Sequence, residues 1–194
     1  MRIAHSSDRV RAFYNDLYMI VINNNIDYNI INWLILDVDG VLTDGSLFFD
    51  NNGVETKAFN VQDGHGIKLW TRAGNSVAVI TGRKSNVVTK RCDELGINHI
   101  YQNAKNKIDF LKEHIASTNT TPEQICYVGD ELVDIPVFRK VGLAIAVANA
   151  VPEALDFADI ITEKHGGKGA VREIIDFLLK KKGQWETVTN RYFK

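Results

Sequence analysis

Residues 33–44 read WLILDVDGVLTD, a short apolar run that ends in two aspartates one residue apart. The run is continuously apolar rather than alternating, which is typical of a strand covered on both faces. Similar short runs recur at 77–80, 125–128, 144–147 and 159–162. Helical patterns lie between the runs, at about 65–73, 84–95, 106–117, 134–140, 151–157 and 169–181. This alternation predicts an α/β fold with a Rossmann-like parallel sheet and helices on both of its faces.

Two parts of the chain depart from this alternation. Residues 46–61 contain Asn51-Asn52-Gly53, and Asn-Gly favours the tight turns of hairpins, so we expect a projecting β-hairpin over about 46–61. Scattered asparagines interrupt any long pattern in residues 1–31. We interpret 1–31 as an N-terminal appendage with one amphipathic helix over Val10–Ile22, and 32–194 as the main domain, ending in a tail at about 183–194.

The bulk composition excludes several classes of protein. The net charge is -1 over 194 residues, with one cationic run at 180–182, which argues against a nucleic-acid binder. No stretch approaches the roughly 18 apolar residues that a membrane-spanning helix needs. Cys92 and Cys126 show no C-x-x-C spacing, so neither a zinc site nor a disulfide framework is expected. We therefore expect a cytoplasmic protein with no nucleic-acid and no membrane partner.

Polar clusters follow three of the predicted strands. Asp37 and Asp39 follow the first, Thr81-Gly82-Arg83 follows the second, and Asp130 with Asp134 follows the third. Open parallel sheets bind ligands at the edge where their strands end, so these clusters should meet. Crowded carboxylates repel one another, and a hard cation with oxygen ligands, of which Mg²⁺ is typical, relieves that repulsion. Capping a helix or closing a turn is the alternative role, and it stays open above all for Asp134.

A metal beside paired carboxylates indicates phosphoryl transfer. An aspartate can attack phosphorus to form an acyl phosphate, and Asp39 is placed to protonate the leaving group and then to activate water. Thr81 and the N–H of Gly82 can bind phosphoryl oxygens, together with a lysine from another loop. A phospho-acceptor signalling domain uses similar groups, but the second aspartate favours hydrolysis over a long-lived phospho-aspartate. A catalytically idle scaffold domain is the third reading.

These residues also resemble a known family. Asp37-x-Asp39-Gly-Val, Thr81-Gly-Arg, Lys107 and Gly129-Asp130-x-x-x-Asp134 resemble motifs I to IV of the haloacid dehalogenase superfamily of phosphatases. The longer segments at 57–64, 80–84, 141–144 and 166–173 resemble the group of 3-deoxy-D-manno-octulosonate (KDO) 8-phosphate phosphatases. The resemblance covers about residues 33–192. It implies a phosphorylated 3-deoxy-2-ketosugar acid as substrate, KDO 8-phosphate first, and a place in lipopolysaccharide biosynthesis. A nine-carbon sialic-type acid 9-phosphate is the alternative substrate.

The resemblance implies roles for the matching residues. Asp37 would be the nucleophile and Asp39 the general acid and base. Mg²⁺ would be held by the Asp37 carboxylate, the Asp39 carbonyl and Asp130, with Asp134 in support. The phosphoryl group would be bound by Thr81, Gly82 and Lys107, for which Lys105 is an alternative. Substrate contacts are expected from Arg83, Asp63, His65, Lys168 and Arg172.

Two residues depart from the group's pattern, and one feature is missing. Gln62 stands where a basic residue is expected, which bears on substrate recognition, and Glu131 stands where aspartate is common. The spacing between the motifs leaves no room for a cap domain, although phosphoryl chemistry benefits from excluding water. We expect a homotetramer in which neighbouring subunits close each site. The hairpin would mediate assembly, and the tail around Trp185 and Arg191 would reach an adjacent site. An ordinary edge flap is the alternative role for the hairpin.

Overall fold

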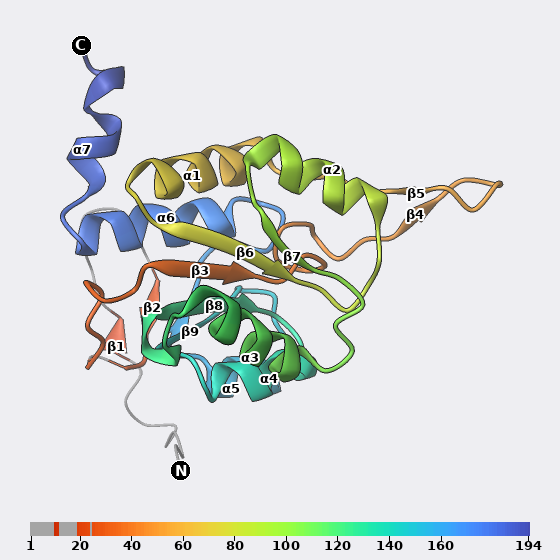
Figure 1. Cartoon of the computed structure of the whole chain (residues 1–194), viewed down its shortest axis with the longest axis horizontal. Helices are drawn as coiled ribbons and strands as arrows, with labels where there is room; N and C mark the ends of the chain where they lie inside the picture. Colours follow the sequence, from red (N-terminus) through yellow and green to blue (C-terminus); the bar gives the residue numbers. More distant parts are fainter. Residues whose placement is uncertain (1–9, 12–18, 24) are drawn as a thin grey trace.

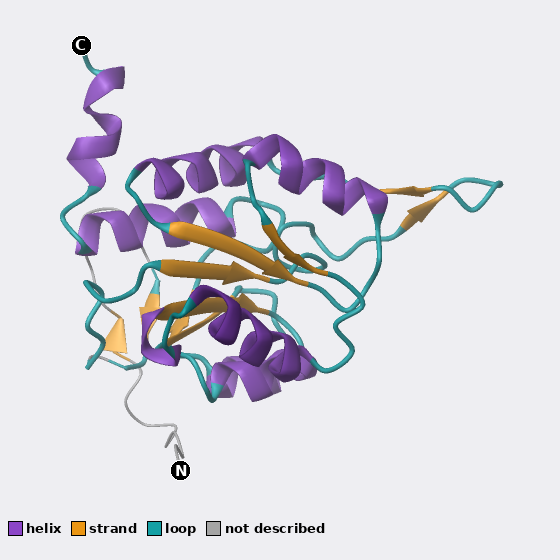
Figure 2. Cartoon of the chain, viewed as in Figure 1, coloured by secondary structure: helices purple, strands orange, loops and turns teal. Residues whose placement is uncertain are grey.

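A parallel sheet between two layers of helices forms the body of the molecule (Figure 1). The computed structural model describes residues 10–11, 19–23 and 25–194. One face of the sheet is covered by α1 (Val61–Arg72), α2 (Asn86–Leu95) and α6 (Ala170–Lys181). The other face is covered by α3 (Lys107–Thr118), α4 (Ile135–Phe138) and α5 (Pro152–Phe157), as the colours of Figure 2 make plain. The predicted α/β architecture is confirmed.

Five of the parallel strands are the apolar runs of the sequence: β3 (Trp33–Leu36), β6 (Ser76–Ile80), β8 (Ile125–Gly129), β9 (Leu143–Ala146) and β10 (Ile160–Ile161). A sixth, β7 (His99–Tyr101), was not among those runs and lies at one edge of the sheet. These strands run parallel in the order β10-β9-β8-β3-β6-β7. Every side chain of β8 and β9 is buried, because helices cover both faces of these strands. None of the described helices combines the length and the apolar character that a membrane crossing requires.

The N-terminal segment corrects one prediction. A helix was expected over Val10–Ile22. Within this range the structure has two strands, β1 (Val10–Arg11) and β2 (Ile20–Val21), and residues 12–18 lie outside the described residues. Strand β2 pairs antiparallel with β10, which would otherwise be an open sheet edge. Met19, Val21 and Ile31 are buried in the core. The boundary after residue 31 therefore stays a prediction, with part of the appendage packed on the main domain.

The predicted hairpin projects from the end of the sheet at which the parallel strands finish (Figure 1). Its strands β4 (Phe48–Phe49) and β5 (Glu55–Thr56) pair antiparallel. The Asp50 carboxylate accepts the N–H groups of Asn52 and Val54, each at 2.8 Å, and closes the turn. The Asn60 side chain accepts N–H groups of the first turn of α1, so this helix begins at Val61 and not at the expected residue 65. The hairpin therefore ends before Val61.

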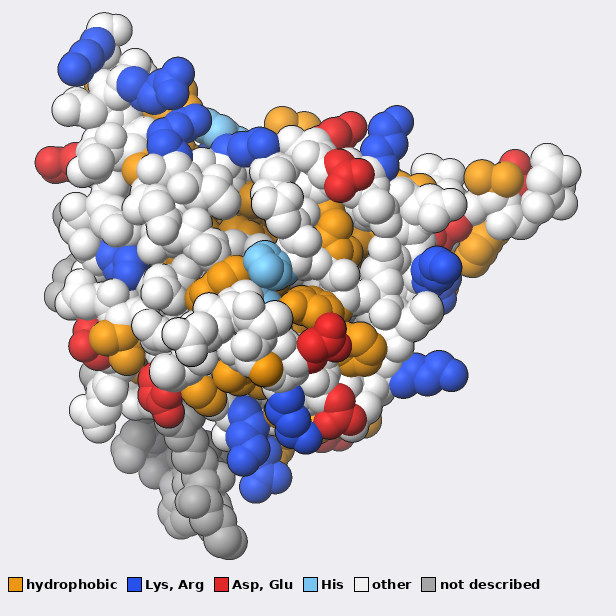
Figure 3. Space-filling view, in the orientation of Figure 1, with side chains coloured by type: hydrophobic (Ala, Val, Ile, Leu, Met, Phe, Trp, Pro, Cys, Tyr) orange, Lys and Arg blue, Asp and Glu red, His pale blue; other side chains and the backbone are white. Residues whose placement is uncertain are grey.

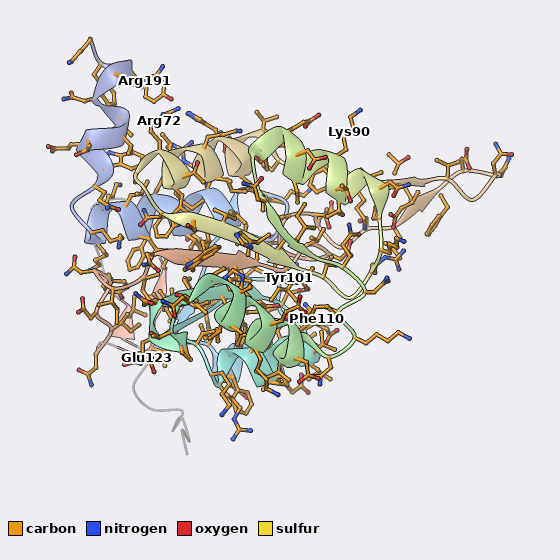
Figure 4. All side chains as sticks on the ribbon, in the orientation of Figure 1. Arg72, Lys90, Tyr101, Phe110, Glu123 and Arg191 are labelled. Carbon is orange, nitrogen blue, oxygen red and sulfur yellow. The ribbon has the colours of Figure 1, made fainter. Side chains whose placement is uncertain are left out.

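The C-terminal tail contacts α1 of its own chain and projects beyond it (Figure 1). After α6 come α7 (Trp185–Thr189) and a 3-10 turn at Asn190–Tyr192. The Tyr192 hydroxyl accepts a hydrogen bond from Arg72 at 2.9 Å and lies 3.1 Å from a ring nitrogen of His65. Figure 4 labels Arg72 on α1 and Arg191 on the tail beside it. Two polar contacts therefore hold the end of the tail against the exposed face of α1.

A cluster of aromatic rings and imidazoles fills the space under α3. The His114 ring lies 4.3 Å from the Trp33 ring and 5.4 Å from the His99 ring, measured between centroids. Tyr101, labelled in Figure 4, places its hydroxyl 3.3 Å from His114 Nδ1. His114 is 0% exposed, and its Nε2 has no hydrogen-bond partner among the described residues. Burial, and then the nearby His99, lower the pKa of His114 from 6.5 to about 4.

This cluster makes stability depend on pH. The folded state binds fewer protons at His114 than the unfolded state, so the contribution of this group is complete above pH 6.5 and is lost as the pH falls toward 4. We expect the free energy of urea unfolding of the wild type, relative to His114→Gln, to fall by about 2 kcal/mol between pH 7.5 and pH 5. His165 is exposed, so His165→Gln serves as the control. The difference in unfolding free energy between the wild type and this variant should be the same at pH 7.5 and pH 5. A constant difference between wild type and His114→Gln would contradict the prediction.

Candidate active site

The register of the sheet brings the three predicted clusters to one edge. Leu36 pairs with Val79 on one side and with Val128 on the other, so the residues that follow β3, β6 and β8 emerge together. Asp37, Asp130 and Asp134 each place an oxygen within 4.8 Å of the others. These three carboxylates form the acidic triad on which the rest of the site is arranged.

Lys107 lies against the acidic triad. It is the first residue of α3 and is 3% exposed. Its Nζ lies 2.7 Å from Asp37 Oδ2 and 2.6 Å from Asp134 Oδ1. Burial lowers the pKa of Lys107, but the Asp37 and Asp134 carboxylates outweigh that effect and the net pKa is raised. Lys107 is thus a buried ammonium between two of the three acids, whereas the alternative, Lys105, is exposed.

Asp134 has a supporting position within the triad. It is 0% exposed, and besides Lys107 its Oδ1 accepts the Tyr127 hydroxyl at 2.7 Å. Its Oδ2 accepts the N–H groups of Asp130 at 2.9 Å and Glu131 at 3.1 Å. Both oxygens are therefore engaged in holding neighbouring groups. Tyr127 was missed at the level of sequence, because it stands inside an apolar run and reads as a core residue.

The other two acids of the triad have the features of cation ligands. Burial, followed by the charges of Asp37 and Asp134, raises the pKa of Asp130 to about 7. Burial also raises the pKa of Asp37 to about 7, with Lys107 opposing the shift. Asp130 Oδ1 is buried without a hydrogen-bond partner among the described residues. A buried carboxylate oxygen with no donor is costly, and an all-oxygen ligand set suits Mg²⁺, so these residues fit that ion.

Two glycines allow the triad to close. Gly40 has a φ of +90°, and a Cβ there would stand 2.0 Å from Asp130 Oδ2. At Gly129, a Cβ would stand 2.5 Å from the carboxyl carbon of Asp134. A side chain at either position would therefore displace a carboxylate of the triad.

Asp39 and the groups after β6 lie beside the triad rather than in it. The Asp39 carboxylate forms an ion pair with Lys57, a residue to which sequence reasoning assigned no role. Arg83 Nε lies 3.9 Å from Asp39 Oδ2. Thr81 is 2% exposed, and its hydroxyl oxygen accepts the N–H of Arg83 at 3.4 Å. Gly82 is exposed at the same loop. The predicted acid/base and phosphate-binding residues are thus gathered at this edge.

The predicted substrate contacts have other partners in this chain. Asp63 is 1% exposed and accepts the backbone N–H of Arg172 at 2.7 Å, so it joins α1 to α6. The Arg172 side chain pairs with Asp176 at 2.6 Å. The Arg83 guanidinium lies 2.9 Å from a Glu55 oxygen, and His65 contacts the tail as described above. The structure therefore does not gather these four side chains at one point.

Lys168 faces an open pocket next to the motif that follows β3. The pocket has a volume of 410 Å³ and is lined by Asp44, Ala58, Phe59, Asn60, Val61, Gln62, Gly167 and Lys168. Lys168 Nζ lies 3.0 Å from Asp44 Oδ2. Gln62, which replaces an expected basic residue, thus lies on the pocket wall. Glu131, the other departure, accepts the N–H of Leu132 at 2.6 Å and so closes the turn after β8.

Comparisons with known proteins agree with this geometry. Residues 93–175 match the family model described as haloacid dehalogenase-like hydrolase. The chain is 50% identical over 151 residues to the KDO 8-phosphate phosphatase KdsC of Escherichia coli, covering 78% of this chain and 80% of that protein.

Two solved structures of KDO 8-phosphate phosphatases are similar to this chain in fold and in sequence. The crystal structure of KDO 8-phosphate phosphatase from Yersinia pestis has a TM-score of 0.81 and 43% identity, over 82% of this chain and 86% of that one. The enzyme from Moraxella catarrhalis, solved with a magnesium ion, a phosphate ion and KDO, has a TM-score of 0.83 and 36% identity, over 85% of this chain and 95% of that one.

The raised pKa values predict how cation binding responds to pH. In the cation-free chain, the pKa values of Asp37 and Asp130 are raised from 3.8 to about 7. Between these two pH values the folded state holds more protons than the unfolded state, so the contribution of these groups to stability falls as the pH rises from about 4 to about 7. A cation must displace the retained protons, so binding weakens below pH 7. We expect the rise in Tm caused by saturating MgCl₂ to be several degrees larger at pH 8 than at pH 6, and to vanish in Asp130→Asn. An equal rise at both pH values would contradict this.

Proposed function

We propose that this chain, which belongs to the family of 3-deoxy-D-manno-octulosonate 8-phosphate phosphatases within the haloacid dehalogenase-like hydrolases, hydrolyses KDO 8-phosphate with Mg²⁺ as cofactor. The observation that carries the proposal is the buried Lys107 between Asp37 and Asp134, next to an oxygen of Asp130 that has no donor in the described part of the chain. The substrate is supported by the names of the relatives and by the bound KDO, phosphate and magnesium of the Moraxella catarrhalis enzyme.

The first half of the reaction transfers the phosphoryl group to the protein. A carboxylate oxygen of Asp37 forms a bond to phosphorus while the bond from phosphorus to the sugar oxygen breaks. Asp39 gives its proton to the departing sugar oxygen, so that an alcohol leaves. Lys107, the Thr81 hydroxyl and the Gly82 N–H bind the phosphoryl oxygens, whose negative charge needs cations and donors around it.

The second half returns the protein to its starting state. Asp39, now ionised, takes a proton from water as the water oxygen bonds to phosphorus. The bond between phosphorus and Asp37 breaks, and inorganic phosphate leaves. Asp37, Asp130 and the Asp39 carbonyl would hold Mg²⁺, which supplies positive charge against the phosphoryl oxygens and keeps Asp37 ionised.

Substrate recognition uses the pocket beside the site in this proposal. Lys168 is a cation on its rim that can meet the carboxylate of a sugar acid, and Gln62 offers an amide group for hydroxyls. The exposed position of Lys168, with 65% of its side chain accessible, leaves it free to exchange Asp44 for a ligand.

Assembly as a homotetramer forms the second part of the proposal. Leu47, Phe48, Phe49 and Val54 of the hairpin are between 46% and 58% exposed, and Figure 3 shows apolar side chains on this projection. Exposed apolar patches of this kind mark interaction surfaces. A neighbouring subunit held by the hairpin would cover a site that has no cap. The tail around Trp185 and Arg191 of each chain would reach the site of an adjacent subunit. A cytoplasmic location is supported by the free, buried thiols of Cys92 and Cys126.

The activity is tested by phosphate release from KDO 8-phosphate with Mg²⁺. We expect turnover by the wild type and a loss of at least about 10³-fold in Asp37→Asn, because no nucleophile remains. Asp93→Asn, an exposed aspartate on α2, is the matched control and should keep full activity. A clear preference for a nine-carbon sialic-type acid 9-phosphate would overturn the substrate. A phospho-enzyme that persists for minutes would instead indicate a phospho-acceptor domain.

The assembly is tested by the solution mass. We expect light scattering to give the mass of four chains for the wild type and a smaller species for the double variant Phe48→Ser, Phe49→Ser, since the substitutions remove the apolar contact. Phe157→Ser changes an aromatic residue that is 38% exposed elsewhere and should leave the mass unchanged. A fully active monomeric wild type would contradict the proposal.

A further inference from the structure

A network of charged side chains connects the base of the hairpin to Asp39. Lys57 stands directly after β5, and only 1% of its side chain is accessible. Its Nζ forms an ion pair with Asp39 Oδ1 and lies 3.4 Å from Glu55 Oε1. Lys57 is therefore a buried cation with one carboxylate of the site on one side and one carboxylate of the hairpin on the other.

Glu55 is the centre of this network. Its Oε1 accepts a hydrogen bond from Arg83 at 2.9 Å, and its Oε2 accepts the Ser85 hydroxyl at 2.6 Å. Arg83 and Ser85 belong to the loop after β6, which also carries Thr81. The hairpin and this loop are thus joined at one carboxylate, and each also reaches Asp39. Lys57, directly after the hairpin, pairs with Asp39 Oδ1. Arg83, in the loop, places its Nε 3.9 Å from Asp39 Oδ2.

The burial of Lys57 distinguishes this contact from a surface ion pair. Exposed pairs contribute little, because water screens them and long side chains lose entropy when held in one geometry. A buried ammonium is tolerated only where carboxylates compensate for the lost hydration. Lys57 has such partners, and its position is set by Glu55 beneath it. Asp39 keeps 22% of its side chain accessible, so one end of the carboxylate is held while the other can meet a substrate.

We propose that Lys57, held in place by Glu55, is a positioning residue that fixes Asp39 Oδ1 and directs Oδ2 toward the leaving sugar oxygen and the attacking water. The inference rests on the proposed function, in which Asp39 first gives and then takes a proton. A general acid acts only within hydrogen-bond reach of its target, and small displacements are costly to the rate. The same hairpin that carries the exposed apolar patch therefore also sets the orientation of the acid and base.

The test compares two leaving groups in Lys57→Met, which removes the charge but keeps a similar length. The sugar oxygen of KDO 8-phosphate needs a proton to leave, whereas p-nitrophenolate leaves without one. We expect kcat/KM to fall about 10²-fold with KDO 8-phosphate and less than about threefold with p-nitrophenyl phosphate. With the second compound we also expect a pre-steady-state burst of p-nitrophenolate, because water attack on the phospho-enzyme is slowed.

Matched variants complete the test. Lys90→Met, on the outer surface of α2 (Figure 4), should leave both values of kcat/KM unchanged. Lys57→Arg should recover part of the loss with KDO 8-phosphate. Glu55→Gln, which leaves Lys57 in the chain, should show the same selective loss in weaker form, and it decides the question if Lys57→Met does not fold.

The outcomes separate this inference from the proposed function. Equal losses with both compounds and no burst would show that Lys57 only supports the fold, and would overturn the inference alone. A wild type that releases no phosphate from either compound would overturn the proposed function and the inference with it.

Discussion

The mutual repulsion of buried carboxylates is the constraint on which the site depends. Asp37, Asp130 and Asp134 lie within 4.8 Å of one another, and burial with this crowding brings the pKa values of Asp37 and Asp130 to about 7. Lys107 offsets the charge of two of these acids, and backbone N–H groups with Tyr127 satisfy Asp134. Three carboxylates and one ammonium leave the arrangement two positive charges short, and a divalent cation supplies them.

The fold serves this constraint through the backbone as much as through side chains. Parallel pairing in register brings the ends of β3 and β8 together, and α3 begins where its first residue meets them. Glycines at 40 and 129 leave room for carboxylates that any Cβ would displace. The strands are buried on both faces, so the sheet holds these ends rigidly, and charged groups are placed more accurately there than a flexible loop would allow.

In the proposed assembly, the segment between β3 and α1 takes the place of a cap domain. It provides the apolar hairpin surface proposed for assembly, the Lys57 and Glu55 pair beneath Asp39, and the pocket wall with Asn60 and Gln62. The exposed apolar surface, the ion pair with Asp39 and the pocket wall thus all fall within one short stretch. A change in the hairpin can therefore reach the chemistry through a chain of ion pairs, without any change in the acidic triad.

Local pattern alone accounts for much of what was predicted. Continuous apolar runs predicted the parallel strands, and Asn-Gly predicted the hairpin. Acids after strands predicted a cluster of Asp37, Asp39, Asp130 and Asp134, whereas the supporting role of Asp134 was implied by the family resemblance. The same reasoning was wrong at Val10–Arg11 and Ile20–Val21, because short apolar runs suit a helix or a strand equally, and pairing with β10 makes Ile20–Val21 a strand. It also placed the start of α1 too late, since Asn60 was not read as a cap.

The amino-acid sequence by itself determined the fold class, the edge of the sheet that carries the chemistry, and the acids gathered there, because each depends on periodicity or on spacing within one strand and its following loop. Only the tertiary structure decided which lysine meets which acid. Lys107 is 27 residues from Asp134, and Lys57 is 18 residues from Asp39. Such pairs depend on how helices and hairpin pack on the sheet, and that packing is set by the whole core rather than by any local pattern.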